Sequence, residues 1–429
     1  MLNINTKLKE LEEQGKRINV GIVGAGQMGR GMVSQMFCMK GICPIIVSDL
    51  NTEIAKKAFI MAGIRNDDIA VANTVSEAET AIKNGRYVVT ENLEVVNKAL
   101  SIDVVIDATG VPEAGAKIAV ESIHNGKHIV MLNVETDVTI GALLKKMADS
   151  AGVVYTVSAG DEPGAIKELY DFADGMGFEV LVAGKGKNNP LDTQANPDTV
   201  REKAIANNMN PKMLTSFVDG TKTMVEMTCV SNSIGFLPTQ KGLIGPKSTV
   251  KDLPKIFTLR EQGGILERYK VVEYVNGVAP GVFVIVTTKL PAVREELAYL
   301  TMGEGPNYVL YRPYHLTSLE TPLSAARAYL YHEPTIAPSG VMVSETLAVA
   351  KKDLKAGDYL DGIGGYTVYG SIDTYENAKS INALPLGLVN SKVRLKRDVR
   401  RGETLTYDTV ELDENSLILQ LRRIQEKTI

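Results

Sequence analysis

Short apolar runs alternate with amphipathic, helix-compatible stretches from residue 18 to about residue 184. This alternation predicts a parallel, doubly wound sheet of the α/β class. The predicted strands are Val20–Val23, Ile45–Val47, Val104–Ile106, Ile129–Leu132, Val153–Val157 and Val180–Ala183. The predicted helices are Met28–Met39, Thr52–Ala62, Leu93–Leu100, Glu113–Ile123, Thr139–Ala148 and Pro163–Ala173. The polar stretch 64–91 exceeds what a connection needs, and we interpret it as an elaboration over one sheet edge.

A different pattern follows residue 188. The segment rich in Asn and Pro, 188–200, reads as a loop, and Pro211–Phe236 reads as one long helix or a broken helical pair. On a single helix Asp219, Lys222 and Glu226 would share one face, which is either a solvated salt-bridge face or part of a site. Further on, the pattern predicts strands at Val271–Tyr274 and Val282–Thr287, a helix at Ala292–Leu300 and an apolar run at Tyr308–Tyr311.

The last part of the chain contains an internal near-repeat. The segment Lys351-Lys-Asp-Leu-Lys-Ala-Gly-Asp-Tyr-Leu360 recurs as Lys396-Arg-Asp-Val-Arg-Arg-Gly-Glu-Thr-Leu405. Both copies hold a glycine turn and follow β-prone residues, so they predict a small β module with approximate two-fold symmetry. Because the character of the chain changes near residue 340, we expect three domains, at 1–160, 161–340 and 341–429.

Composition narrows the class of protein. The chain has 429 residues and a net charge of −4, which gives no sign of a nucleic-acid-binding surface. No apolar run reaches the ~18 residues of a membrane span, and the N-terminus lacks the apolar core of a signal peptide. We therefore expect a soluble, cytoplasmic protein with no membrane partner.

The stretch Ile18–Gly29 carries the strongest chemical signal. An apolar run enters the pattern Gly24-x-Gly26-x-x-Gly29, whose Gln27 and Met28 we also expect at the cofactor, and a helix-compatible segment begins at Met28. In a dinucleotide-binding fingerprint, such glycines allow a tight turn, the approach of a pyrophosphate and close helix packing. Asp49 ends the next apolar run, where a ribose-binding carboxylate is expected. The alternative is a ligand-free Rossmann-like core whose glycines are purely structural.

Polar residues follow four consecutive predicted strands. These strand ends contain Asp107-Ala108-Thr109-Gly110, Asn133, Asp161 with Glu162, and Lys185 with Lys187. Ligands of doubly wound sheets bind beyond the carboxyl ends of the strands, so we expect the four ends to form one crevice. Each could alone be an ordinary turn, since Gly, Asn and Asp are turn formers.

A separate basic pair follows the run Tyr308–Tyr311. Arg312 and His315 lie three residues apart in Arg312-Pro-Tyr-His315. This pair could bind an anionic substrate. The alternative is a surface arginine with a histidine packed against the tyrosines.

These motifs together resemble the homoserine dehydrogenase superfamily. The shared pattern is the fingerprint Gly24–Gly29, Asp107–Gly110 near the nicotinamide, and Gly126-Lys-His-Ile-Val-Met-Leu-Asn133. Val134 follows Asn133 where those enzymes typically have lysine, and Asp219 and Lys222 are spaced differently from their catalytic pair. Homoserine is therefore not the expected substrate.

The C-terminal repeat is similar to an SAF (β-clip) domain. Combined with the Rossmann half, the whole chain resembles the deoxyxylulose-phosphate reductoisomerase-like oxidoreductases, on four further motifs. These are Gly160-Asp-Glu-Pro163, Ala183-Gly-Lys-Gly-Lys187, Asp219-Gly-Thr-Lys222 and Tyr311-Arg-Pro-Tyr-His315. The resemblance implies a Rossmann domain, an α+β catalytic and dimerisation domain, a small all-β SAF domain, and a homodimer.

A hydride-transfer reaction requires a group that stabilises oxyanion character and a group that handles the proton. Lysines in a crevice can do both, and the candidates are Lys185, Lys187 and Lys222. We hypothesise that Lys187 or Lys222 polarises the substrate oxygen, while Arg312 and His315 hold a carboxylate or phosphate. The expected supporting residues are Asp161, Glu162, Asp219 and Glu226 for orientation or proton relay, with Asn133 and Glu226 also at the substrate.

The expected function is NAD(P)-dependent hydride transfer on a small anionic oxo or hydroxy compound, a sugar phosphate or hydroxy acid. One alternative is a reductoisomerase that converts deoxyxylulose phosphate to methylerythritol phosphate. Another, of a different class, is a non-catalytic dinucleotide-binding sensor or scaffold.

The identity of the cofactor stays open at this level. Asp49 has no adjacent arginine, which favours NAD, whereas the reductoisomerase-like resemblance implies NADPH. That resemblance also implies a divalent metal, for which Asp161, Glu162 and Glu226 are candidate ligands, although their spacing is not specific.

Overall fold

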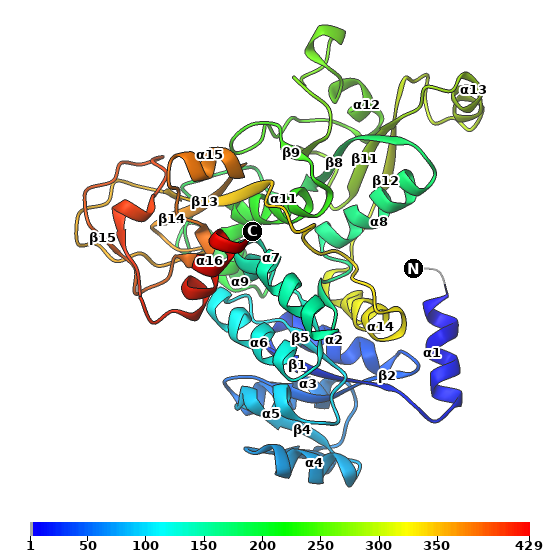
Figure 1. The fold of residues 1–429 in the computed structure, drawn as a ribbon, viewed down its shortest axis with the longest axis vertical. Coiled ribbons are helices and arrows are strands. Elements are labelled where there is room, and N and C mark those ends of the chain that lie inside the picture. Colours follow the sequence, from blue (N-terminus) through cyan, green and yellow to red (C-terminus); the bar gives the residue numbers. More distant parts are fainter. Residues whose placement is uncertain (1–2) are drawn as a thin grey trace. The chain divides into compact units, whose positions relative to one another are not determined.

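The computed structural model describes residues 3–429, which form two compact units (Figure 1). The first unit comprises the chain up to Gly164 together with Leu316–Gly340 and Leu421–Ile429, and the second comprises Ala165–His315 and Val341–Gln420. Two late segments thus return to the first unit, because they contribute side chains to its core and hydrogen bonds to its helices. The three predicted domain ranges stay a prediction. The α/β class is confirmed.

The first unit is built on a parallel seven-stranded sheet with the order β3-β4-β2-β1-β5-β6-β7. Its strands are β1 (Ile18–Val23), β2 (Ile42–Ser48), β3 (Ile69–Val71), β4 (Tyr87–Thr90), β5 (Val104–Asp107), β6 (His128–Met131) and β7 (Tyr155–Val157). The predicted doubly wound sheet is therefore confirmed. Strand β1 pairs with β2 on one side and β5 on the other, which makes the edge beyond β1 and β5 the switch point of the sheet.

The stretch 64–91 corrects one interpretation. It is not an elaboration over the sheet edge but supplies β3, α4 (Val75–Lys83) and β4, and so adds two strands to the sheet. Strand β3 has only three residues, and a polar stretch with so short an apolar run gives no clear strand pattern. Thr74 and Glu77 form a capping box that begins α4.

Helices cover this sheet and bury its apolar strands. They are α1 (Ile4–Glu13), α2 (Gln27–Phe37), α3 (Thr52–Met61), α5 (Leu93–Lys98), α6 (Pro112–His124), α7 (Val134–Ala151) and α14 (Thr321–Tyr331). Val20 and Ile22 of β1 lie in one core with Met36 of α2 and Ala325 of α14. Strands buried on both faces carry near-continuous apolar runs, which is why their positions were readable in the sequence.

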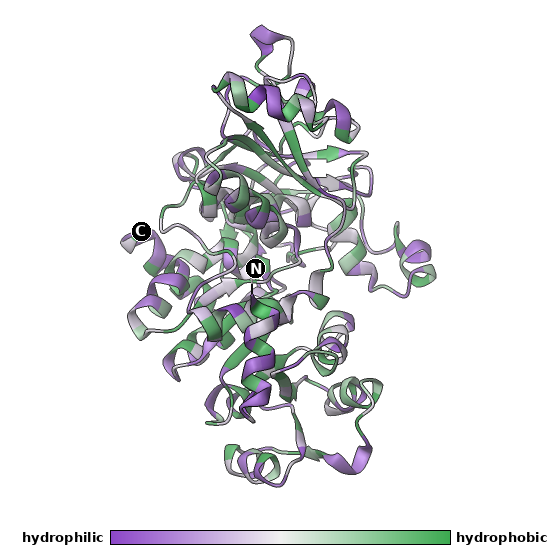
Figure 2. Cartoon of the chain, turned by 90° about the vertical axis from the view of Figure 1, so that its right-hand side faces the viewer, coloured by the Kyte–Doolittle hydropathy of each residue, from purple (hydrophilic) through white to green (hydrophobic). Residues whose placement is uncertain are grey.

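The second unit contains a mixed five-stranded sheet with the order β12-β11-β8-β10-β9. Its strands are β8 (Glu179–Lys187), β9 (Leu237–Pro238), β10 (Val271–Asn276), β11 (Val282–Thr287) and β12 (Asn307–Arg312). Strand β8 pairs in parallel with β10 and antiparallel with β11. We expected β8 in the Rossmann sheet, and this was wrong, because an apolar run has the same appearance whichever sheet it joins. Figure 2 shows these strands largely in the hydrophobic colour.

The helices of the second unit include α11, which packs on this sheet. The helices are α8 (Glu162–Gly175), which starts at the boundary of the units, α9 (Arg201–Ala206), α10 (Pro211–Val218), α11 (Thr221–Ile234), α12 (Leu253–Ile256), α13 (Pro291–Tyr299), α15 (Tyr375–Ser380) and α16 (Leu417–Thr428), which ends in the first unit. Met224 and Met227 of α11 form a core with Ala183 of β8 and Val272 of β10. Within residues 3–429, no helix combines the length and apolarity that a membrane span requires.

The C-terminal β module, residues 341–420, follows the predicted two-fold pattern in its hydrogen bonds. Its strands are β13 (Ser344–Ala350), β14 (Val368–Thr374), β15 (Arg394–Leu395) and β16 (Val410–Glu411). Leu354 and Val399, which are equivalent in the repeat, exchange both backbone hydrogen bonds. The amide of Ala356 donates to Asp398 at 2.9 Å, and that of Arg401 donates to Asp353 at 2.8 Å. Each bond therefore has a counterpart with the copies exchanged; the SAF assignment stays a prediction.

Candidate functional site

The glycine loop after β1 combines two positions that the fold requires to be glycine with one that it does not. Gly24 has φ +98°, and a Cβ there would lie 2.7 Å from the Ala108 carbonyl oxygen; a Cβ on Gly29 would lie 2.0 Å from the Gly24 oxygen. Gly26 caps α2 with φ −61°, and a Cβ there would meet no atom within 4 Å. Open space therefore lies at the N-terminus of α2, where unpaired amides attract an anion. This arrangement fits a dinucleotide pyrophosphate.

Asp49 lies directly after β2 and is fixed against this loop. Its Oδ2 accepts a hydrogen bond from the Ala25 amide at 2.8 Å, and its Oδ1 accepts one from the Asn51 amide at 3.1 Å. Each carboxylate oxygen has a second lone pair, which can accept a ribose hydroxyl. Asp49 thus lies at the carboxyl end of β2, beside the half-buried start of the loop, and its ribose-binding role stays a prediction.

A buried polar network joins the ends of β5 and β6. Asp107 accepts hydrogen bonds from the amide and hydroxyl of Thr109, at 2.8 and 2.7 Å, and from the Asn133 amide group at 2.9 Å. Burial raises the pKa of Asp107 to about 6, against the opposing effect of these donors. Asn133 also caps α7 by accepting from the Thr136 amide at 3.2 Å. The network fixes the backbone of Ala108–Gly110 next to Gly24.

The remaining predicted residues of the first unit lie at helix starts. Gln27 and Met28 open α2, exposed and half-buried respectively. Asp161 is buried directly before α8, and the half-buried Glu162 is the first residue of that helix. Their roles in proton relay or metal binding stay predictions.

Two lysines on β8 form the charged centre of the second unit. Lys185 and Lys187 lie within the strand, two residues apart and therefore on one face, and not beyond its end as expected. Lys185 forms a buried ion pair with Glu226 of α11, and the Lys187 ammonium donates to the Phe217 carbonyl at 2.7 Å. Burial, together with the neighbouring Lys185 charge, lowers the pKa of Lys187 to about 8.

Asp219 does not share a helix with Lys222 and Glu226, contrary to one of the two readings of this segment. Asp219 ends α10, and Gly220, with φ +87°, turns the chain before α11 begins at Thr221. Its Oδ1 accepts from the Thr221 amide at 2.9 Å, and its Oδ2 lies 2.7 Å from the Lys351 ammonium. The helical pair is therefore broken at a glycine in the left-handed region, which residues with a Cβ rarely adopt. Lys222 and Glu226 are one turn apart on α11.

Arg312 ends β12 and is held by an acid and an aromatic ring. Its guanidinium lies 3.0 Å from Glu168 of α8 and 4.6 Å from the centroid of the Tyr314 ring. His315 follows and is half-buried. The Arg312 side chain is only 14% exposed, so it is not the surface arginine of the alternative. The substrate-binding role of this pair stays a prediction.

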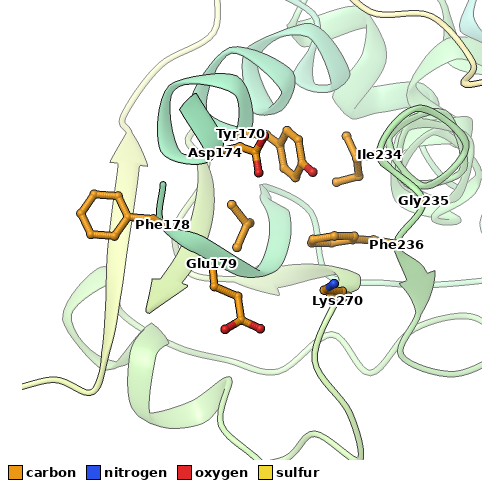
Figure 3. A pocket seen from close by; sticks show the side chains of 9 residues that line it. Tyr170, Asp174, Phe178, Glu179, Ile234, Gly235, Phe236 and Lys270 are labelled. Atoms are coloured by element: carbon orange, nitrogen blue, oxygen red, sulfur yellow. The ribbon is translucent and has the colours of Figure 1, made fainter. Parts of the chain in front are cut away.

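A cavity of about 280 Å³ in the second unit lies at the start of β8, at the end of the strand away from Lys185 and Lys187 (Figure 3). Among the residues that line it, Tyr170 of α8 and Phe236 after α11 pack edge to face with their ring centroids 5.8 Å apart, and Lys270 lies below Phe236 in Figure 3. Glu179, the first residue of β8, lies at its rim, whereas Lys185 and Lys187 are near the last. None of the predicted site residues lines this cavity.

Sequence reasoning missed the partners of the predicted residues. These are Lys351, Glu168 and the Phe217 carbonyl. In the sequence, Lys351 stands out only as the first residue of the repeat, and a charged residue in that position is expected on the surface. No local signal distinguishes it, because its burial depends on a segment far away in the sequence.

Residues 160–321 match the family model described as oxidoreductase DRL, catalytic domain. This match covers more than a third of the chain and supports an oxidoreductase. No curated protein matches the chain.

Many solved structures show remote similarity, and three of them illustrate its range. A probable dehydrogenase from Thermotoga maritima has 11% identity and a TM-score of 0.42, covering 75% of this chain and 90% of that one. The structure of DOX-P reductoisomerase in complex with magnesium has 14% identity and a TM-score of 0.42, covering 76% and 72%. Levoglucosan dehydrogenase in complex with NADH has 16% identity and a TM-score of 0.28, covering 42% and 46%. Similarity this remote says nothing about the substrate.

Proposed function

We propose that this protein is an NAD(P)-dependent oxidoreductase that acts on a small, anionic oxo or hydroxy compound. The observation that carries the proposal is the glycine loop at the switch point of the parallel sheet, with open space at Gly26 and the Asp49 carboxylate fixed beside it. The oxidoreductase match over residues 160–321 supports the same reaction class. When bound, the nicotinamide donates or accepts the hydride.

The second unit supplies the groups that act on the substrate oxygen. Lys187, with its lowered pKa, can hold a proton for the oxygen or remove one from it near neutral pH. The neighbouring Lys185 is ion-paired with Glu226, which fixes its position beside Lys187. The protonated Lys187 then supplies the positive charge that stabilises a substrate oxyanion. Arg312 and His315 are the proposed contacts of the substrate's carboxylate or phosphate.

A nucleotide titration tests this proposal before any substrate is identified. Purified protein is titrated with NAD, NADP, NADH and NADPH while its thermal unfolding is followed. A ligand at 100 times its Kd that binds only the folded state adds about 2.7 kcal/mol to the free energy of unfolding, so Tm rises clearly. Adenosine is the control for non-specific stacking. If none of the four dinucleotides raises Tm, the oxidoreductase proposal is wrong.

Asp49 leads us to propose NAD as the preferred cofactor. A carboxylate binds a ribose hydroxyl and repels a 2′-phosphate. Asp49→Asn keeps an oxygen for the Ala25 amide but removes the charge, so NAD affinity is expected to fall by about tenfold. The preference for NAD over NADP is expected to narrow at the same time. Dissociation constants for both nucleotides measure the change, and an unaltered ratio would remove Asp49 from cofactor selection.

The homodimer implied by the family resemblance is also part of this proposal. Analytical ultracentrifugation of the purified chain measures its mass in solution, and a monomer over the micromolar range would contradict the dimer.

A further inference from the structure

Lys351 of the C-terminal β module is a buried cation. Its side chain is 2% exposed, and its ammonium lies 2.7 Å from Oδ2 of Asp219. The same ammonium donates to the carbonyl oxygens of Ala195, at 2.6 Å, and Gly365, at 2.8 Å. The ammonium thus donates to two carbonyl oxygens and is ion-paired with one carboxylate, and these three groups come from three separate segments of the second unit.

The repeat shows that the module does not itself require a lysine buried at this position. Lys396 is the equivalent residue in the second copy, and it is exposed. Transfer of an ammonium out of water is costly unless it is well paired. The lysine is buried in the first copy only, where it is paired with Asp219 from another part of the unit. This difference points to a role for Lys351 outside the module.

The module also binds one face of α11 along its length. The hydroxyl of Thr221 accepts from the Gly370 amide at 2.9 Å, and that of Thr228 accepts from Thr346 at 2.8 Å. Asn232 accepts from the Ser344 amide at 3.0 Å. Residues 221, 228 and 232 have the spacing of one helix face, whereas Lys222 and Glu226 lie on another. The module thus holds the helix whose other face presents Glu226 to the lysines of β8.

We propose that Lys351 is a positioning residue for the lysine site: it neutralises Asp219 and fixes the start of α11, and so sets the electrostatic environment of Lys187. The claim that this positioning affects catalysis rests on the proposed function. The claim that Lys351 and Asp219 affect the pKa of Lys187 does not.

The charges around Lys187 determine the direction in which each substitution should shift the pKa of Lys187. Lys185 on the same strand and Lys203 of α9 lower the pKa of Lys187, and Asp219 and Glu226 raise it. Burial raises the pKa of Asp219, and the Lys351 charge opposes this effect. Where Asp219 stays ionised after loss of the Lys351 charge, its carboxylate is uncompensated and the pKa of Lys187 should rise. Loss of the Asp219 charge leaves the Lys351 ammonium uncompensated, so the pKa of Lys187 should fall.

The experiment is an NMR titration of the full chain with ¹³Cε-labelled lysine, in which Lys187→Met assigns the Lys187 resonance. Lys351→Met should raise the pKa of Lys187 by about half a unit or more, and Asp219→Asn should lower it by a similar amount. Lys396→Met, the repeat-equivalent control, should leave it unchanged. The double variant K351M/D219N removes both buried charges, should fold most readily, and should return the pKa toward that of the original protein.

A merely structural role makes a different prediction. General loosening of the unit would move the pKa of Lys187 upward in both single variants, toward that of a solvated lysine. Shifts of the same sign in the folded single variants would overturn the proposal, as would an unshifted pKa of Lys187 in folded Asp219→Asn. The titration requires neither cofactor nor substrate, so it can succeed even if nucleotide binding fails, and the two proposals are tested separately.

Discussion

Replacement of Lys187 by methionine is expected to lower kcat by about 100-fold or more, the usual contribution of a positioned proton donor or acceptor. Methionine preserves the length and apolar stem of the side chain but removes the ammonium that donates to the Phe217 carbonyl. Nucleotide affinity should stay unchanged, because the proposed dinucleotide site is formed by the glycine loop of the first unit. The measurement is turnover on sugar phosphates and hydroxy acids, with nucleotide binding determined in parallel.

The dependence of the rate on pH shows whether Lys187 donates or accepts the proton. Because the pKa of Lys187 is lowered to about 8, the ammonium form predominates below that pH and the amine form above it. Carbonyl reduction needs the proton donor, so its rate should fall as the pH rises through about 8. Alcohol oxidation needs the acceptor, so its rate should rise over the same interval. Lys187→Met should abolish both transitions.

Two variants make this result interpretable. Lys255→Met, at an exposed lysine of α12, is the control for loss of a charge without a role in the site. Lys222→Met separates the two lysines named as rivals, because Lys222 lies on α11 and not on the strand. Full turnover in Lys187→Met with a loss of 100-fold in Lys222→Met would transfer the role to Lys222.

The sequence predicted the first unit far better than the second. Strands β1, β2, β5, β6 and β7 are almost entirely buried, so their apolar runs stand out, and glycines with the Rossmann spacing mark the turn after β1. The short strands β3 and β4 were the exceptions. In the second sheet, β8 pairs with β10 and β11, which lie far along the chain, and no local pattern fixes such a choice. Their charge identified Lys185 and Lys187 as candidate site residues, but we expected them beyond the end of a strand of the first sheet and not within β8.

The partners of the site residues were the least predictable part. Spacing alone could not show that Lys185 pairs with Glu226, because a strand and a helix must pack before the two charges meet. For Asp219, the adjacent Gly220 was the informative residue, since glycine favours the left-handed turn that ends α10. Gly220 therefore favours the broken pair over a single helix.

Gly26→Val should abolish tight dinucleotide binding while the protein stays folded. The two flanking glycines do not allow such a test, because a Cβ at Gly24 or Gly29 would collide with backbone oxygens and disturb the fold. Gly26 has an ordinary φ of −61° and open space around the position of a Cβ. The valine should cost only about 1 kcal/mol of stability, the usual cost of losing a good N-cap residue.

The binding cost should be much larger than the folding cost. The branched side chain would fill the space through which a pyrophosphate reaches the amides at the start of α2. We expect affinity to fall by at least about 100-fold, or about 2.8 kcal/mol. Gly175→Val is a matched control, because a Cβ on Gly175, at the end of α8, also meets no atom within 4 Å.

Calorimetric titration of the better-bound dinucleotide, with Tm measured on each unliganded variant, resolves the outcomes. Loss of binding in Gly26→Val, with Tm close to that of Gly175→Val, places the pyrophosphate at the helix N-terminus. Unchanged affinity in Gly26→Val would mean that the open space above α2 is not where the dinucleotide binds. The glycines at 24 and 29 would then be explained by the packing of β1 and α2 alone, because the backbone contacts there exclude a Cβ with or without a ligand.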